Sequence, residues 1–167
     1  MKIKETLMTV VALAAIVLAG VLAYRHEVRP PQEICKLCQR PVHAAVAYQL
    51  DLKDGSHERT CCPRCAMHHQ LSRPELVARA WATDVNSGKK IAALSAFYVE
   101  GGDVEYCTVG EHHDLRREPA TVAEREFDRC LPTLVAFRTK QDAETYQRQH
   151  GGRVVDFDGA TASVKER

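Results

Sequence analysis

The sequence lacks an excess of charge of either sign. Its 23 basic residues are offset by 22 acidic ones, which leaves a formal net charge of +1. A chain without a strong positive field does not attract a nucleic-acid backbone, so no nucleic-acid partner is expected. At 167 residues the chain is also too short for a long multidomain enzyme, since about 135 residues remain for folding beyond an N-terminal apolar segment.

Two chemical arrangements are missing as well. No Ser-His-Asp set or carboxylate pair can be brought together by local spacing, so we do not expect a hydrolytic enzyme. No cysteine follows Leu18-Ala19-Gly20, which excludes a lipoprotein anchor at this position.

An uncharged run does occur near the N-terminus, after a short leader at residues 1–5. Residues 6–24 carry no charge, and about 19 residues rising ~1.5 Å each nearly span the ~30 Å hydrocarbon layer of a membrane. The run is longer than the ~7 to 15 residue core of a cleaved signal peptide. It therefore predicts a retained single-pass transmembrane anchor, with cleavage after Val21-Leu22-Ala23 as the alternative.

The orientation of this anchor does not follow from its flanking charges. Lys2 and Lys4 precede the run, and Arg25 and Arg29 follow it, so the positive-inside comparison is nearly balanced. The leader is too short to form a functional domain on its side of the membrane. We therefore expect the folded domain outside the cytoplasm, on the periplasmic side of the cell membrane. A linker at residues 25–33, stiffened by consecutive prolines, would hold that domain off the bilayer.

The rest of the chain predicts an α+β domain over residues 34–158, followed by a flexible tail at 159–167. Apolar residues alternate from Val46 to Leu52, which is the period of a strand with one buried face. An Asp-Gly turn and a return strand follow, and then a helix that starts at Pro63.

We expect these elements to form two strand-strand-helix units, at residues 34–72 and 76–158. In the second unit, Thr139-x-x-Asp142 resembles a capping box that opens a helix. The polar region 101–129 has little periodicity and predicts a long loop.

Two Cys-x-x-Cys pairs carry the strongest chemical signal. Cys35 and Cys38 form the first pair, and Cys62 and Cys65 form the second. Each pair supplies two sulfurs on one turn, so together they predict a four-thiolate site for a tetrahedral Zn(II) or for Cu(I). The order of knuckle, hairpin and helix resembles a treble-clef zinc finger, in which the helix N-terminus favours thiolates. A disulfide framework is the alternative.

Further candidate ligands lie close to the two pairs or in the polar loop. Thiolate and imidazole both suit zinc or copper, and the supplementary candidates are Cys61, His43, His68 and His69. Cys107 and Cys130 lie in or beside the loop. We expect a mutual disulfide between them, with packing as small apolar groups or a second metal site as the alternatives.

Several segments of the second unit match a known pattern in order. They are Trp81 to Gly88, Ala96 to Val99, Pro132 to Phe137, Asp142-Ala143 and His150 to Phe157. This ordered set resembles the nitrous oxide reductase accessory protein family, NosL. The resemblance implies two strand-strand-helix units, membrane attachment outside the cytoplasm, and Cu(I) binding in the assembly of a copper enzyme.

The chain departs from that family at its metal-associated motifs. Cys38-Gln39-Arg40 stands where the family has Cys-Gly-Met, and Cys130-Leu131-Pro132 lies near the later Pro-Met-Gly position. A transmembrane run replaces the lipoprotein cysteine, and the cluster Cys61-Cys62-Pro63-Arg64-Cys65 adds thiols. These differences indicate a divergent relative whose metal and client can differ.

The sequence therefore supports three functional hypotheses. The first is a membrane-anchored extracytoplasmic metal-binding protein, not an enzyme, that acts as a copper carrier or assembly factor for a recipient metalloenzyme. The second is a structural zinc module with four cysteine ligands and no metal delivery. The third is a thiol-disulfide oxidoreductase that uses Cys62-Pro63-Arg64-Cys65, although the motif lacks the βαβ pattern of such enzymes.

Overall fold

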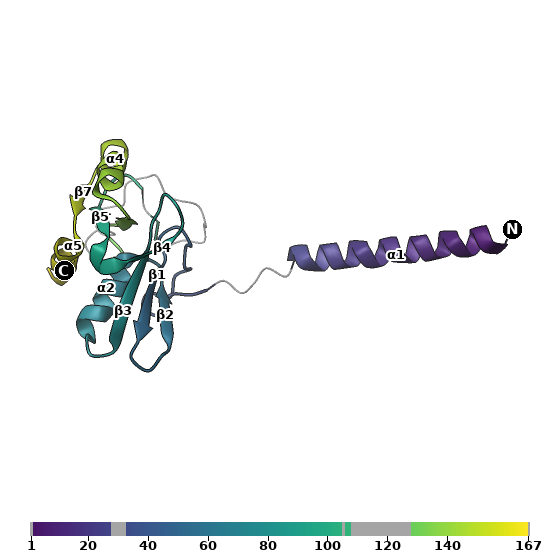
Figure 1. The fold of residues 1–167 in the computed structure, drawn as a ribbon, viewed down its shortest axis with the longest axis horizontal. Coiled ribbons are helices and arrows are strands. Elements are labelled where there is room, and N and C mark those ends of the chain that lie inside the picture. The colour runs from purple at the N-terminus through teal and green to yellow at the C-terminus, as the bar shows by residue number, and fades with distance from the viewer. Residues whose placement is uncertain (1, 28–32, 105, 108–127, 167) are drawn as a thin grey trace. The chain divides into compact units, whose positions relative to one another are not determined.

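The computed structural model describes residues 2–27, 33–104, 106–107 and 128–166 (Figure 1). The chain divides into two compact units, with the boundary between Gln32 and Glu33. The proline-containing centre of the expected linker and most of the expected polar loop lie outside the described residues.

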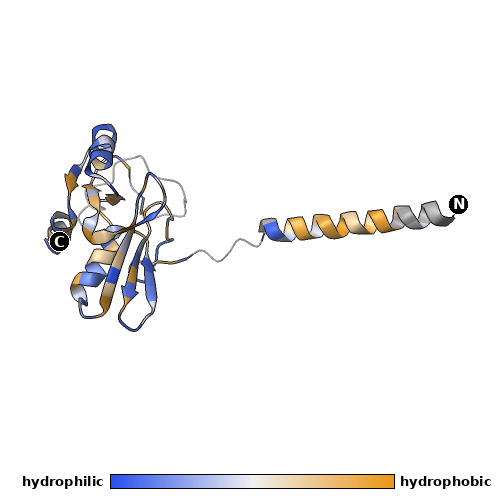
Figure 2. Cartoon of the chain, viewed as in Figure 1, coloured by the Kyte–Doolittle hydropathy of each residue, from blue (hydrophilic) through white to orange (hydrophobic). Residues whose placement is uncertain are grey.

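The first unit is one helix, α1 (Lys2–Glu27), which also takes in residues expected as a separate leader. Large apolar side chains are exposed along it, including Met8 at 75% and Ile16 at 68%. Figure 2 shows apolar residues over most of its length. In the described part of the chain, no helix combines the length and the hydropathy needed to cross a membrane. The structure thus does not show the anchor expected at residues 6–24.

The second unit confirms the α+β prediction with two small antiparallel sheets. The first sheet has the order β2-β1-β3-β4, and the second has the order β6-β5-β7. The first sheet consists of β1 (Tyr48–Leu52), β2 (His57–Thr60), β3 (Val77–Thr83) and β4 (Lys90–Ala92). The second consists of β5 (Phe97–Glu100), β6 (Leu134–Phe137) and β7 (Arg153–Val155).

The first sheet crosses the expected boundary between the two strand-strand-helix units. The β1-β2 hairpin forms as predicted, and Asp54 accepts a hydrogen bond from the backbone of Ser56 at 2.9 Å in its turn. The other edge of β1 pairs with β3, which the sequence assigned to the second unit. A two-stranded hairpin is marginally stable alone and leaves backbone groups unpaired at its edges, and β3 satisfies those of β1.

Three helices and a short 3-10 turn complete the described part of the second unit. They are α2 (Pro63–Ser72), the turn η1 (Ala93–Ser95), α4 (Lys140–His150) and α5 (Phe157–Lys165). The predicted N-cap is present, since the Thr139 hydroxyl accepts a hydrogen bond from the Asp142 amide at 3.1 Å.

The prediction of a flexible tail at residues 159–167 is wrong for most of that range, because α5 extends to Lys165. The Asp156 carboxylate accepts a hydrogen bond from the Gly159 amide at 2.8 Å and so caps the helix. Ala160 and Val164, four residues apart on one face, are buried at 0% and 2% exposure. The cap and the buried apolar face therefore explain why residues 159–165 form a helix that packs on the core of the domain.

Neighbouring side chains of β5 belong to different core clusters, and each cluster includes residues of helices. Tyr98 joins a cluster with Met67 of α2 and Val164 of α5. Its neighbour Val99 faces a separate cluster that includes Ala143 of α4. The second sheet is therefore covered on both faces, and α2 lies against the same cluster as α5. A third cluster consists mainly of cysteines.

Candidate metal centre

The first cysteine pair lies on a tight loop before the first sheet. The Cys35 amide donates to the Arg40 carbonyl at 2.8 Å, and the Gln39 amide donates to the Cys35 carbonyl at 2.9 Å. Gln39 has a φ of 60°, a conformation that favours glycine. It stands where the family named in the sequence analysis has the glycine of its Cys-Gly-Met motif.

The second set of cysteines lies where β2 passes into α2. Cys61 follows the end of β2, Cys62 is the N-cap of α2 with extended backbone, and Cys65 lies in the first helical turn. Pro63 starts the helix as predicted, since its fixed φ suits the first position. The change from strand to helix directs the neighbouring Cys61 and Cys62 side chains differently.

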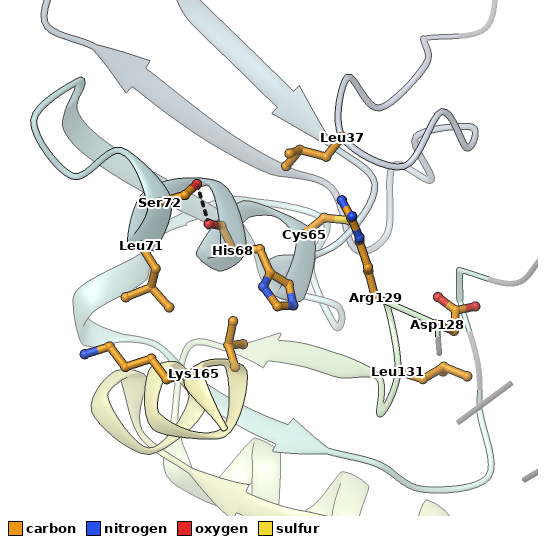
Figure 3. A pocket seen from close by; sticks show the side chains of 10 residues that line it. Leu37, Cys65, His68, Leu71, Ser72, Asp128, Arg129, Leu131 and Lys165 are labelled. Atoms are coloured by element: carbon orange, nitrogen blue, oxygen red, sulfur yellow. Dashed lines mark hydrogen bonds between the residues drawn. The ribbon is translucent and has the colours of Figure 1, made fainter. Parts of the chain in front are cut away.

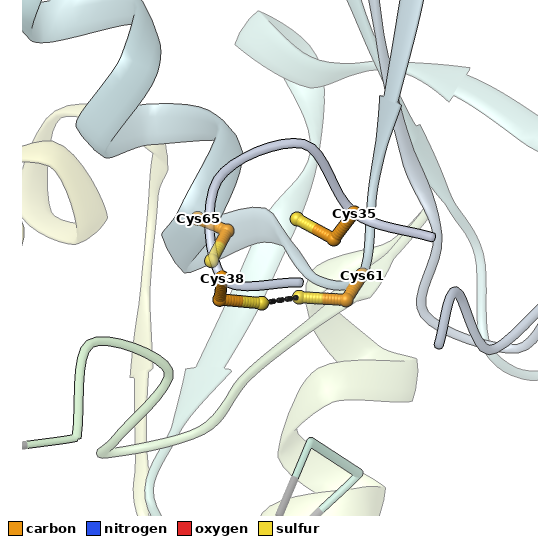
Figure 4. A group of neighbouring side chains, drawn as sticks. All are labelled: Cys35, Cys38, Cys61 and Cys65. Atoms are coloured by element: carbon orange, nitrogen blue, oxygen red, sulfur yellow. Dashed lines mark hydrogen bonds between the residues drawn. The ribbon is translucent and has the colours of Figure 1, made fainter. Parts of the chain in front are cut away.

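The structure brings Cys35, Cys38, Cys61 and Cys65 together, and their sulfurs all lie within 4.8 Å of one another. Figure 4 shows the four side chains converging from the loop, the end of β2 and α2. Cys62, expected in this foursome, belongs instead to another one with Cys61, Cys65 and Cys130. The treble-clef order of knuckle, hairpin and helix is present.

The two distant cysteines join the same cluster. Cys107 and Cys130 form a group of four with Cys38 and Cys61, again within 4.8 Å. All seven cysteines lie in the described part of the chain, and none of them forms a disulfide. The structure therefore does not show the disulfide expected between Cys107 and Cys130, and it places both in a group that could hold a metal ion.

An ion pair holds these distant thiols in place. The Arg40 guanidinium donates to the Cys107 carbonyl at 2.7 Å and to the Asp128 carboxylate at 2.9 Å. The same carboxylate accepts a hydrogen bond from the Cys130 amide at 2.8 Å. Both charged side chains are largely buried, at 16% and 7% exposure. From the sequence, Arg40 was notable only because it stands where the family motif has methionine. In the structure, it connects the first loop to both later cysteines.

The sulfur spacing fits soft metal ions. Sulfur-sulfur distances are 3.3 Å for Cys38 and Cys61, 3.5 Å for Cys65 and Cys130, 3.8 Å for Cys61 and Cys62, and 3.9 Å for Cys61 and Cys130. A tetrahedral ion with metal-sulfur bonds of ~2.3 Å places its ligands about 3.8 Å apart. The donor set therefore suits a transition-metal ion, and soft thiolates favour Cu(I) or Zn(II).

The packed thiols shift one another's pKa values. The hydrogen bond with Cys107 is the largest cause that lowers the pKa values of Cys38, Cys62 and Cys130. The same partner raises the pKa of Cys61. Because adjacent anions in a buried cluster repel one another, ionisation of one thiol favours retention of the protons on its neighbours. A metal cation would replace those protons.

The three candidate histidines do not enter the sulfur groups among the described residues. His69 faces Glu58, with 3.7 Å between its Nε2 and the carboxylate. His43 is partly buried. His68 lines a cavity of about 590 Å³ that also reaches Cys65 (Figure 3). Burial, and then the charge of Arg64, lower the pKa of His68 and favour its neutral imidazole.

Arg64, inside the second Cys-x-x-Cys pair, is a residue whose role the sequence analysis missed. Its side chain is fully buried, and it donates to the Glu100 carboxylate at 2.6 Å, the Ser163 hydroxyl at 3.1 Å and the Pro132 carbonyl at 2.6 Å. These partners lie on or beside β5, β6 and α5. Arg64 therefore fixes the first turn of α2, which carries Cys65, to the second sheet.

Comparison with known proteins supports the fold expected from the resemblance. No family model matches the chain. The chain is 28% identical over 135 residues to the HTH-type transcriptional repressor CutR of Bacillus subtilis (strain 168), and the match covers 80% of this chain but only 60% of the repressor. The crystal structure of the copper chaperone NosL from Shewanella denitrificans matches 75% of this chain and 87% of its own, with a TM-score of 0.56 and 19% identity. The chain therefore has a NosL-like fold.

Proposed function

We propose that the protein binds Cu(I) through its cysteine cluster and acts as a copper carrier or assembly factor for a recipient metalloenzyme. The observation that carries this proposal is the convergence of seven buried or half-buried thiols into overlapping groups, each within 4.8 Å. So many soft donors in one place suit a thiophilic ion. The chain shares its fold with a protein that is described as a copper chaperone and not as an enzyme. This likeness favours copper over zinc.

The exposure of the cluster supports delivery. Cys38 is partly exposed, whereas the other six cysteines are buried. A ligand at the surface can be exchanged stepwise for a ligand of a partner, which is how thiolate carriers release an ion. The cavity that reaches Cys65 gives a second approach, and its rim includes the neutral imidazole of His68.

The proposal includes attachment to a membrane through α1, with the folded domain on the periplasmic side. Its support is the exposed apolar surface of α1, where Val11 is 61% exposed and Leu18 60% exposed. Exposed apolar area of this extent calls for a partner or a lipid environment. Extraction of membranes with alkaline carbonate tests the attachment, and protease accessibility in spheroplasts tests the side. Release by carbonate, or protection from protease, would contradict this part.

A structural zinc site is the second candidate. Cys35, Cys61 and Cys65 are exposed by no more than 1%, and a buried four-thiolate shell in a treble-clef arrangement is typical of inert structural zinc. Such an ion would stabilise the fold without being transferred.

One experiment separates these functions. The full chain, purified in mild detergent under anaerobic reducing conditions, is given Cu(I) or Zn(II), and bound metal and free thiols are counted before and after a competing chelator. Copper that the chelator removes without unfolding supports the carrier. Zinc that leaves only on unfolding supports the structural site. A chain with no metal and few free thiols would refute both, and would favour a disulfide or redox role.

A further inference from the structure

The three sulfur groups overlap in a regular way. The sulfur of Cys61 belongs to all three. Each of the other six is either shared by two groups or confined to one. The shared sulfurs are those of Cys38, Cys65 and Cys130, and the confined ones are those of Cys35, Cys62 and Cys107.

This pattern is the one that shared ligands produce. A single tetrahedral ion is satisfied by four thiolates, and Cys35, Cys38, Cys61 and Cys65 already supply them. Separate tetrahedral ions at all three positions would need far more sulfurs than the seven present. Seven are enough only if one sulfur bridges three ions and three sulfurs each bridge two.

We infer that the seven cysteines form one polynuclear metal-thiolate site, which holds more than one soft ion with the Cys61 sulfur as its central bridging ligand. The inference rests on the proposed function, because it takes binding of a thiophilic ion as given. It adds the stoichiometry of the site and the ligand role of Cys107 and Cys130.

Charge supports more than one ion. Six of the seven cysteines are buried, and thiolates packed at 3.3 to 3.9 Å repel one another strongly in a low-dielectric interior. One cation can offset the repulsion among only the few thiolates that it binds, and the remaining thiols then keep their protons. Each further ion displaces thiol protons to solvent and replaces them with a charge that two or three sulfurs share.

Specific contacts in the fold also hold the additional thiols at the cluster. The buried ion pair of Arg40 and Asp128 positions the segments of Cys107 and Cys130 beside Cys38. A mononuclear site made of the other cysteines has no need of this arrangement. The sulfurs of Cys38 and Cys61 lie 3.3 Å apart, and two of the four-sulfur groups have this edge in common.

The test is anaerobic titration of the full chain in mild detergent with Cu(I) alone, followed by native mass spectrometry and X-ray absorption spectroscopy. We expect more than one copper ion per chain at saturation and a copper-copper scattering contribution. Saturation at one ion without that contribution would overturn this inference and leave the proposed function intact. A chain that binds no Cu(I) would overturn both.

The adjacent residues Cys61 and Cys62 provide a matched pair of variants, since both are buried and lie at the same strand-helix junction. Cys62→Ser should lose at most one ion and keep the copper-copper signal, because its sulfur is confined to one group. Cys61→Ser should lose more copper than Cys62→Ser and weaken that signal, because its sulfur belongs to all three groups, while Cys38, Cys65 and Cys130 still link the groups in pairs. Equal loss in both would overturn the central role of Cys61. Near-UV circular dichroism checks folding, and if either variant fails to fold, the wild-type stoichiometry and scattering still decide the polynuclear assignment.

Discussion

Replacing Arg64 with methionine tests whether the buried ion pair holds α2 in place. The variant keeps an apolar stem but removes the guanidinium, which leaves the Glu100 carboxylate, 7% exposed, and the Pro132 carbonyl without this donor. Breaking a buried pair on one side costs about 3 to 5 kcal/mol. Arg153 still pairs with Glu100 at 2.8 Å, so we expect about 3 kcal/mol, the lower end of that range.

For a domain of this size, that loss corresponds to a fall in melting temperature of about 10 °C. Thermal unfolding of the metal-free full chain, followed by near-UV circular dichroism, measures it. The matched control is Arg79→Met, because Arg79 also faces a carboxylate, that of Asp51 at 3.9 Å, but its side chain is 73% exposed. The control should cost less than about 1 kcal/mol. Equal effects in the two variants would refute the role assigned to Arg64.

Three other predictions concern the second sheet and its helices. Burial alone would raise the pKa of Glu100, but a serine hydroxyl and two arginines lower it below its ordinary 4.5. Its stabilising contribution is thus complete above that value and lost in more acid solution, so Glu100→Gln should be less stable than wild type at pH 7 and should converge with it in acid denaturation curves. Gly152→Ala would place a Cβ 2.5 Å from a carbonyl oxygen at a φ of +83° and should cost about 3 kcal/mol in urea unfolding, whereas Gly88→Ala, with φ +67° and open space around it, should cost about 1. Removal of residues 159–167 should lower the melting temperature, because it takes the buried Val164 out of the core, and an unchanged temperature would contradict the packing of α5.

Local sequence was enough to predict several elements of the fold. The alternation that ends at Leu52, the Asp-Gly turn, the start of α2 at Pro63 and the cap at Thr139 all occur as expected. Each depends on side-chain periodicity or on hydrogen bonds within a few residues. The same locality explains why the two Cys-x-x-Cys pairs were recognised as the start of a thiolate site.

The pairing of strands could not be predicted in this way. The partner of the second edge of β1 is β3, and nothing in the period of either strand specifies that pairing. It depends on which edge is free once the hairpin has formed and on burial against the second sheet. The helix α5 was missed for a related reason, since its short apolar face gains stability only from the core that it covers.

What the sequence determined by itself is the presence of soft donors and their local spacing, hence the class of metal ion that such donors favour. Only the tertiary structure decided which sulfurs meet. The strand-to-helix junction selects Cys61 over Cys62 for the group with Cys35, because backbone direction there sets where each side chain points. The addition of Cys130 depends on the ion pair of Arg40, a contact between residues far apart in the chain. Such long-range contacts form only when the whole domain folds, so no local pattern could reveal that all seven cysteines share one cluster.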